Sequence, residues 1–382
     1  WRTMDCTLYL ADNCNLECTY CYEGHQKGMD RISKTTVEKA IDFLEQINTD
    51  REIDLTFLGG EPMLNKEMMY YAVEYSKKKL VKFNYIITTN GTCCDKKDID
   101  YMHENGFKVS LSIDGDRRTH ELNRKIKGKD DAGKTYDIII ENLKYMVKNS
   151  FPVIIRMTVT CNNVQYLYSN VLYFYNMGVT KLDIEFNEFE EWKIHSLQLL
   201  EHELQKLDFW YLSNGDKIKY LSLFDGKITF FIAKRKVQFC NAGRKSHFVI
   251  NSKGEFYPCN YVCNQEQWKI GNLKTVFDEK KCFNNIKLHI EKQSKCTECE
   301  INFACVGARC GFKNFNLTGF LNKPNDNLCN LEKILYKHNE LVFAEMYRRK
   351  DARLMNLLEY ALVKGYPLTN WMIELMEQEK EC

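Results

Sequence analysis

The chain has 382 residues, enough for about two to three domains that each bury a core of their own. Its 54 Lys and Arg residues against 52 Asp and Glu residues leave a formal net charge of +2. This balance argues against nucleic acid or an anionic membrane as a partner. Seventeen cysteines, an odd number, cannot all form disulfides. The composition therefore excludes a pure disulfide scaffold and favours metal or cluster ligation.

No stretch of the sequence approaches the roughly 18 apolar residues of a membrane-spanning helix, and the N-terminus has no secretion signal. We therefore expect a cytoplasmic protein with no membrane partner. The chain begins with Trp1 and not with Met, so we also expect that an N-terminal piece has been trimmed.

The first half of the chain alternates strand-like and helix-like segments. Six runs rich in β-branched and aromatic residues are predicted strands: 7–11, 53–58, 83–89, 108–113, 153–160 and 181–187. Segments of helical periodicity lie between them: 34–48, 66–79, 96–105, 136–149 and 165–177. Six such units predict a parallel α/β sheet, curled into a partial (β/α)6 TIM barrel with function at the C-terminal strand ends. The polar connection 115–135 is predicted to be a lid or a solvated loop.

Cys14, Cys18 and Cys21 follow the first predicted strand as C-N-L-E-C-T-Y-C. Three thiolates on one short loop can hold three irons of a 4Fe-4S cluster and leave the fourth iron open. The alternative is a zinc site, which would need a fourth protein ligand such as His25.

This motif resembles the signature C-x3-C-x-aromatic-C of the radical S-adenosylmethionine (SAM) superfamily, with Tyr20 as the aromatic residue. Gly59-Gly60-Glu61 ends the second predicted strand and resembles the family's GGE motif, which receives the amino group of SAM. Glycines allow a close backbone approach to a ligand, and a carboxylate accepts hydrogen bonds from an ammonium group.

Further matches lie at the ends of later predicted strands. Thr89 and Asn90 resemble the family's segment near the SAM ribose, and Ser112 and Asp114 match its fourth strand end, where a serine contacts SAM. The stretch H-E-L-N-R ends at Arg124, which resembles an arginine that pairs with the SAM carboxylate, and Arg156 is a second candidate.

The resemblance implies that the open iron binds SAM and that reductive cleavage gives a 5'-deoxyadenosyl radical, which takes a hydrogen atom from the substrate. It implies an electron donor such as flavodoxin or ferredoxin.

A second cysteine-rich region resembles the SPASM domain, whose family pattern is C-x(9–15)-G-x4-C, a gap, C-x2-C-x5-C-x3-C, a gap and C. The matching residues are Cys240, Cys259, Cys296, Cys299, Cys305, Cys310 and Cys329. One spacing departs from the pattern, because four residues separate Cys305 from Cys310 where the family has three.

The resemblance implies two auxiliary 4Fe-4S clusters, and so three clusters in all. Cys240, Cys259 and Cys310 would bind the first, and Cys296, Cys299, Cys305 and Cys329 the second. The first is then one ligand short, and either Cys263 completes it or an iron stays open to a substrate thiolate. A zinc ribbon is the alternative. The implied organisation is a radical SAM partial barrel (1–235), a SPASM iron-sulfur domain (236–335) and C-terminal helices (336–382).

Radical enzymes with a SPASM domain mostly modify peptides. Anaerobic sulfatase-maturating enzymes make formylglycine and resemble this chain around Gly254–Cys259, but they place an aspartate base directly after that cysteine. Asn260 stands there instead, and an amide cannot accept the substrate proton.

Maturases that cross-link ribosomally made precursor peptides, through a thioether or a carbon-carbon bond, resemble residues 112–124 and 154–160 better. A formylglycine-generating enzyme, a dehydrogenase acting on a small molecule, and an iron-sulfur protein without radical activity stay as alternatives. Many of these maturases grip the leader of the precursor with a separate small domain. In this protein we expect that domain before Trp1, in another chain, or replaced by the C-terminal helices.

Overall fold

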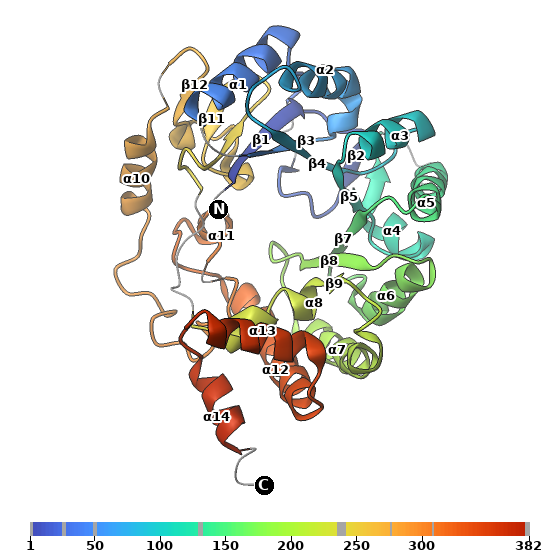
Figure 1. Ribbon diagram of the computed structural model, residues 1–382, viewed down its shortest axis with the longest axis vertical. Helices are drawn as coiled ribbons and strands as arrows, with labels where there is room; N and C mark the ends of the chain where they lie inside the picture. The colour runs from blue at the N-terminus through green and yellow to red at the C-terminus, as the bar shows by residue number, and fades with distance from the viewer. Residues whose placement is uncertain are drawn as a thin grey trace. The chain divides into compact units, whose positions relative to one another are not determined.

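A computed structural model gives the fold of the protein. It describes residues 3–24, 28–48, 52–128, 133–234, 242–275, 277–307 and 309–378. The chain divides into two compact units (Figure 1). The first consists of Trp1–Arg156 and Asn241–Ile290, and the second of Met157–Cys240 and Glu291–Cys382. The domain boundaries expected after residues 235 and 335 stay a prediction.

Parallel strands form the centre of the first unit. In sheet order they are β1 (Met4–Ala11), β3 (Ile53–Gly59), β4 (Phe83–Thr89), β5 (Lys108–Ser112) and the start of β7 (Val153–Val159). The helices between them are α1 (Lys34–Ile47), α2 (Lys66–Ser76), α3 (Lys96–Glu104) and α5 (Gly133–Lys148). The predicted alternation of strands and helices is confirmed. Because the strands are parallel, their C-terminal ends and the loops that follow them lie at one edge of the sheet.

The sheet continues on the other side of β1 with strands from the second cysteine-rich region. β10 (His247–Ile250) pairs in parallel with β1, and β11 (Glu255–Tyr257) and β12 (Gly271–Asn272) follow in antiparallel pairing. Helix α10 (Glu279–Leu288) completes this part. β1 thus lies inside the sheet, which agrees with the burial of seven of its eight residues. The sequence patterns did not predict these additional strands.

Of the two interpretations of 115–135, the solvated loop is wrong for residues 117–126, and the lid stays a prediction. Helix α4 (Arg117–Asn123) begins after Asp116, whose side chain accepts a hydrogen bond from the Thr119 N–H as an N-terminal cap. Strand β6 (Arg124–Ile126) follows and pairs antiparallel with β2 (Leu16–Cys18), which lies within the first cysteine motif. The segment therefore holds the cysteine loop through backbone hydrogen bonds.

The second unit contains the short parallel pair β8 (Lys181–Phe186) and β9 (Tyr220–Leu221). Its helices are α6 (Leu167–Asn176), α7 (Ile194–Asn214), α8 (Ser222–Asp225), α9 (Ile228–Ile232), α11 (Gly311–Thr318), α12 (Asp326–Arg348), α13 (Ala352–Val363) and α14 (Asn370–Gln378). A hydrogen bond of 2.6 Å between Asp208 Oδ2 of α7 and His338 Nδ1 of α12 joins the two longest helices. Two predicted ligands of the cysteine-rich region adjoin these helices, because Cys310 directly precedes α11 and Cys329 lies on α12.

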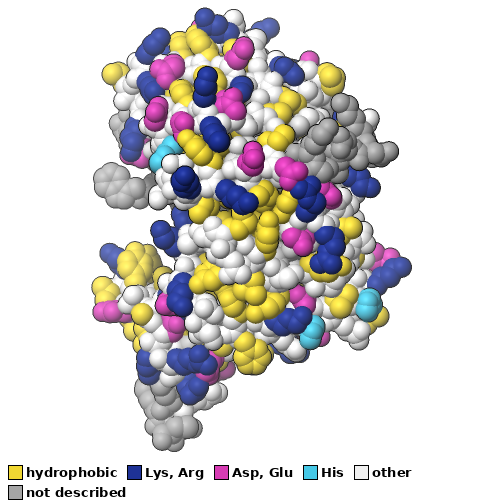
Figure 2. Space-filling model, turned by 90° about the vertical axis from the view of Figure 1, so that its right-hand side faces the viewer, with side chains coloured by type: hydrophobic (Ala, Val, Ile, Leu, Met, Phe, Trp, Pro, Cys, Tyr) yellow, Lys and Arg dark blue, Asp and Glu magenta, His cyan; other side chains and the backbone are white. Residues whose placement is uncertain are grey.

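Within the described part of the chain, no helix combines the length and the apolar character that crossing a bilayer requires. On the face shown in Figure 2, Lys and Arg side chains are interspersed with Asp and Glu side chains. This mixture of charges agrees with the net charge of +2.

Candidate functional site

Cys14, Cys18 and Cys21 occupy the loop after β1, as predicted. The loop is shaped by its own backbone, because the Leu16 N–H points to Cys14 Sγ at 3.4 Å and the Cys21 N–H donates to the Cys18 carbonyl at 3.2 Å. Cys14 is buried, and Cys18 and Cys21 are half-buried. The three thiols thus belong to one short, ordered turn.

Gly59 and Gly60 allow the end of β3 to approach this loop. A Cβ atom on Gly59, whose φ is +140°, would lie 2.1 Å from the Ala11 carbonyl oxygen, and one on Gly60 would lie 2.5 Å from the Asn13 carbonyl. The Glu61 N–H then donates to the Asn13 carbonyl at 2.9 Å. Glycine is therefore required at both positions because the end of β3 lies against the backbone of Ala11 and Asn13. The contact with a ligand expected from the sequence stays a prediction.

The Glu61 carboxylate is almost fully buried, with 1% of its surface exposed. It accepts hydrogen bonds from the Thr89 hydroxyl at 2.6 Å, the Asn90 N–H at 2.7 Å and the Met63 N–H at 3.0 Å. Burial raises the pKa of Glu61, and these hydrogen bonds oppose the increase. The structure thus brings the predicted residues Glu61, Thr89 and Asn90 together beside the cysteine loop.

Asn90 links the end of β4 to the cysteine loop. Its Nδ2 lies 3.7 Å from Cys14 Sγ and donates to Asn15 Oδ1 at 3.0 Å, while Asn15 Nδ2 donates to the Thr92 hydroxyl at 2.7 Å. Thr92 belongs to the segment 88–92 that resembles the family's segment near the SAM ribose. The sequence analysis did not single out Asn15, and only its position within the cysteine motif could have indicated a role.

Asp114 and Arg124 form a buried ion pair, with Arg124 Nη2 donating to Asp114 Oδ1 at 3.1 Å. The Tyr20 hydroxyl donates to the other carboxylate oxygen at 2.6 Å, and the guanidinium lies 5.4 Å from the centre of the Tyr20 ring. Arg124 is also the residue opposite Cys18 in the β2–β6 pairing. The partner of Arg124 in this structure is thus Asp114, and its expected contact with the SAM carboxylate stays a prediction.

Ser112 and Arg156 are direct neighbours on β5 and β7. Ser112 is the last residue of β5, where the loops that follow carry function in folds of this class, whereas Arg156 lies in the middle of β7. The structure therefore groups these two predicted residues with each other, and their contact with SAM stays a prediction.

His120 was not singled out as a site residue. Its side chain is fully buried on α4, and among the described residues neither ring nitrogen has a hydrogen-bond partner. Burial, together with the positive charge of Arg124, lowers the pKa of His120 to about 3. The imidazole is therefore neutral at physiological pH.

The donor atoms of the first loop fit an iron-sulfur cluster. Burial raises the pKa of Cys18 to about 11, and Arg124 opposes this while Asp114, Cys21 and Cys14 add to it. Iron binding displaces such protons and compensates the thiolate charges. Among the described residues, no three Cys, His, Asp or Glu side chains converge tightly enough for a single metal ion. The zinc alternative stays a prediction, because its candidate ligand His25 lies outside the described residues.

The described cysteines of the second region fall in both compact units. Cys259 and Cys263 flank a 3-10 turn over Asn260–Val262 in the first unit, and Cys240 lies outside the described residues. Burial raises the pKa of Cys263, and the charges of Glu23 and Asp12 add to this. The rings of Tyr22 and Tyr261 lie 5.0 Å apart, so the chain next to Cys21 touches the turn between Cys259 and Cys263.

The remaining predicted ligands belong to the second unit. Cys296 and Cys299 share a turn in which the Cys299 N–H donates to the Cys296 carbonyl at 3.4 Å. The charge of Cys296 contributes to the raised pKa of Cys329, after burial and against the effect of Lys295. Cys305 is buried, and Cys310 is half-buried directly before α11. These five cysteines offer soft sulfur donors, and the four of them predicted to bind the second auxiliary cluster, Cys296, Cys299, Cys305 and Cys329, fit its chemistry, but their ligand roles stay predictions.

Comparison with known proteins agrees with this geometry. Residues 8–165 match the radical SAM superfamily. The cysteine-type anaerobic sulfatase-maturating enzyme of Clostridium perfringens is 28% identical to the chain over 329 residues, which cover 78% of this chain and 86% of that enzyme.

Two solved structures share the fold. Native anSMEcpe with bound AdoMet and the Cp18Cys peptide superposes with a TM-score of 0.72 at 20% identity, covering 94% of this chain and 99% of that one. Streptococcus suis SuiB bound to the precursor peptide SuiA superposes with a TM-score of 0.59 at 16% identity, covering 86% and 76%.

Proposed function

Because residues 8–165 match the radical SAM superfamily and the chain is similar to the anaerobic sulfatase maturases, we propose that it is a SAM-binding radical enzyme that cross-links a ribosomally made precursor peptide. The bond formed is a thioether between a cysteine sulfur and carbon, or a carbon-carbon bond. Structural relatives with a bound peptide, SuiB among them, support a peptide substrate.

In this proposal Cys14, Cys18 and Cys21 hold the SAM-binding cluster. When bound, the cluster and SAM supply a 5'-deoxyadenosyl radical that removes a hydrogen atom from the peptide. Glu61, fixed by Thr89 and Asn90, presents buried carboxylate oxygens at the edge where SAM would bind. The electron donor would be a flavodoxin or a ferredoxin.

The auxiliary cysteines would hold two further clusters, with the ligand sets implied by the SPASM resemblance. The first set, Cys240, Cys259 and Cys310, lacks a fourth member. Cys263 or the substrate cysteine would complete it. Thioether formation then balances if the radical takes one hydrogen atom from carbon, the thiol loses one proton, and one electron passes to an auxiliary cluster.

The presence of Asn260 favours peptide cross-linking over formylglycine formation. The residue follows Cys259 where sulfatase maturases have an aspartate base, and its amide has no basic oxygen that could take a thiol proton. Its Oδ1 is buried and has no hydrogen-bond partner among the described residues. A neutral side chain at this position favours a reaction in which the substrate thiol is deprotonated by binding to iron.

Intact-mass analysis of the peptide encoded beside this gene, co-expressed with the enzyme, tests the proposal. We expect a loss of two hydrogens and, for a thioether, a cysteine that resists alkylation. The Cys18→Ala variant is the matched control, which should leave the peptide unmodified. A peptide aldehyde that reacts with a hydrazide would instead establish formylglycine formation and refute the proposal. A second test supplies a small alcohol or sugar, whose oxidation would favour a dehydrogenase.

A further inference from the structure

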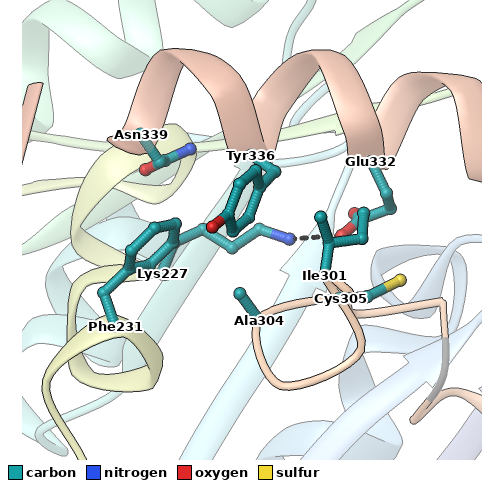
Figure 3. A pocket seen from close by; sticks show the side chains of 8 residues that line it. All are labelled: Lys227, Phe231, Ile301, Ala304, Cys305, Glu332, Tyr336 and Asn339. Carbon is teal, nitrogen blue, oxygen red and sulfur yellow. Dashed lines mark hydrogen bonds and ion pairs between the residues drawn. The ribbon is translucent and has the colours of Figure 1, made fainter. Parts of the chain in front are cut away.

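A buried ion pair lies in the core of the second unit. Lys227, directly before α9, donates to Glu332 Oε2 of α12 at 2.7 Å, and only 10% and 8% of the two side chains are exposed. Figure 3 shows the pair beside a small pocket whose other linings include Ile301, Cys305 and Asn339. The cavity of about 10 Å³ has room for about one water molecule, which excludes a substrate site.

Glu332 connects two segments that carry predicted cluster ligands. Its Oε2 accepts a hydrogen bond of 2.9 Å from the N–H of Val306, the residue after Cys305. Glu332 also lies three positions after Cys329 on α12, and side chains at this spacing share a helix face. A single carboxylate thus holds the Cys305 loop against the helix of Cys329.

Other hydrogen bonds restrain the same loop from its two ends. The Arg309 guanidinium donates to the carbonyls of Cys305 and Phe303. Asn314 Nδ2 donates to the Gly307 carbonyl at 2.8 Å. These hydrogen bonds fix the shape of the loop. The Lys227–Glu332 ion pair adds a charged contact through the Val306 N–H.

The energetics of buried ion pairs argue for a role other than stability. Removing two charges from water costs about as much as their attraction returns, and apolar residues of similar size are often equally stabilising. A carboxylate alone would hold the Val306 N–H but would place a buried negative charge near an anionic cluster. Lys227 compensates this charge, and the charge and hydrogen bonding around a cluster set its reduction potential.

We propose that Lys227 and Glu332 are positioning residues for the auxiliary cluster bound by Cys296, Cys299, Cys305 and Cys329. Glu332 orients the Cys305 loop, and Lys227 keeps the cluster's surroundings electrically neutral so that its potential suits an electron acceptor. The inference rests on the proposed function, because it requires that these cysteines bind a cluster.

Redox titration followed by electron paramagnetic resonance tests this in the reconstituted full-length chain. The background is a Cys14→Ala/Cys18→Ala/Cys21→Ala variant, which removes the signal of the SAM-binding cluster. Lys227→Met leaves a negative charge and should lower one auxiliary potential, whereas Glu332→Gln leaves a positive charge and should raise the same potential. An uncompensated charge at close range should change the reduction equilibrium by about tenfold, or 59 mV for one electron.

Three further variants serve as controls. Lys227→Arg and the neutral double variant Lys227→Met/Glu332→Gln should restore the wild-type potential. Lys337→Met makes the same charge change on the exposed side of α12, where 66% of the lysine side chain is accessible, and should cause no shift. If Glu332→Gln fails to fold, comparison of Lys227→Met with the double variant still tests the inference. If Lys227 acted only through packing, removing the charge of Glu332 as well would not restore the wild-type potential.

Shifts of opposite sign that cancel in the double variant support the inference. Unchanged potentials, or shifts of the same sign in both single variants, overturn it. Absence of auxiliary iron in the Cys14→Ala/Cys18→Ala/Cys21→Ala background overturns it as well, together with the proposed clusters. Normal shifts in a chain that modifies no peptide would instead leave the inference intact and refute only the proposed function.

Discussion

The ion pair between Asp114 and Arg124 gives the sharpest test of how the cysteine loop is held. Replacing Asp114 with Asn keeps the shape of the side chain but leaves the Arg124 charge buried without its counter-charge. The charges are 3.1 Å apart and less than 10% exposed, so at an effective dielectric constant of about 20 their attraction is about 5 kcal/mol. Breaking a buried pair typically costs about 3–5 kcal/mol, which agrees with this value.

We therefore expect Asp114→Asn to lower the free energy of unfolding of the first unit by about 3–5 kcal/mol. The loss should extend to the cluster, because Arg124 is paired with Cys18 across β2 and β6. Urea unfolding of the full chain, followed by fluorescence, measures the stability, and iron and sulfide analysis measures cluster occupancy after reconstitution.

Asp116→Asn is the matched control for this substitution. It changes the same side chain two residues away, at the N-cap of α4, where Asn caps about as well as Asp. This variant should unfold like the wild type and bind a full complement of iron. An Asp114→Asn chain with wild-type stability and iron content would show that the pair does not hold the loop.

Three other substitutions test neighbouring features. Between pH 7 and pH 5 the wild type should lose about 2 kcal/mol of stability, because the unfolded chain binds a proton at His120 near pH 6.5 while the folded pKa is about 3. His120→Gln should remove that slope in urea titrations, and an unchanged slope would contradict the burial. Gly60→Ala places a Cβ atom 2.5 Å from the Asn13 carbonyl and should lower the melting temperature and the iron content, whereas a normal melt would show that the approach can relax. Lys313→Met leaves Glu188 buried without its 2.8 Å partner and should cost about 3–5 kcal/mol; raising the pH should make the loss larger, because the carboxylate then ionises.

The sequence predicted those parts of the fold that depend on local pattern. Buried and half-buried residues alternate in β3 and β4, as in a strand whose two faces have different surroundings, and the predicted boundaries agree within a residue or two. The motif residues Glu61 and Asn90 were identified by their resemblance to radical SAM motifs, and their positions after neighbouring strands of a parallel sheet predict that they lie close together. The sequence could predict that these two residues lie near each other, but not that the Asn90 N–H donates to the Glu61 carboxylate.

The connection 115–135 was misread because its regular elements are too short to show a period. Helix α4 has seven residues and β6 has three, and neither is long enough for hydrophobic periodicity to stand out. What fixes α4 and β6 is tertiary: the Asp114–Arg124 pair and the β2–β6 ladder. An N-cap aspartate three residues before Thr119 was the one local signal available.

The larger omission concerns strands that are distant in sequence from their partners. β10 pairs with β1 although their paired residues, such as Leu8 and Ile250, lie far apart along the chain. No local pattern encodes such a pairing, because each short strand is compatible with many partners. Its effect on the site is direct. The turn after β10 approaches the end of β1, where the Ser252 hydroxyl donates to Asp12 Oδ2 at 2.9 Å, and the turn after β11 reaches Tyr22 through Tyr261. The first unit thus joins the Cys14–Cys21 loop to the Cys259–Cys263 turn by its sheet, so loss of the β1–β10 pairing would disturb both cysteine groups together.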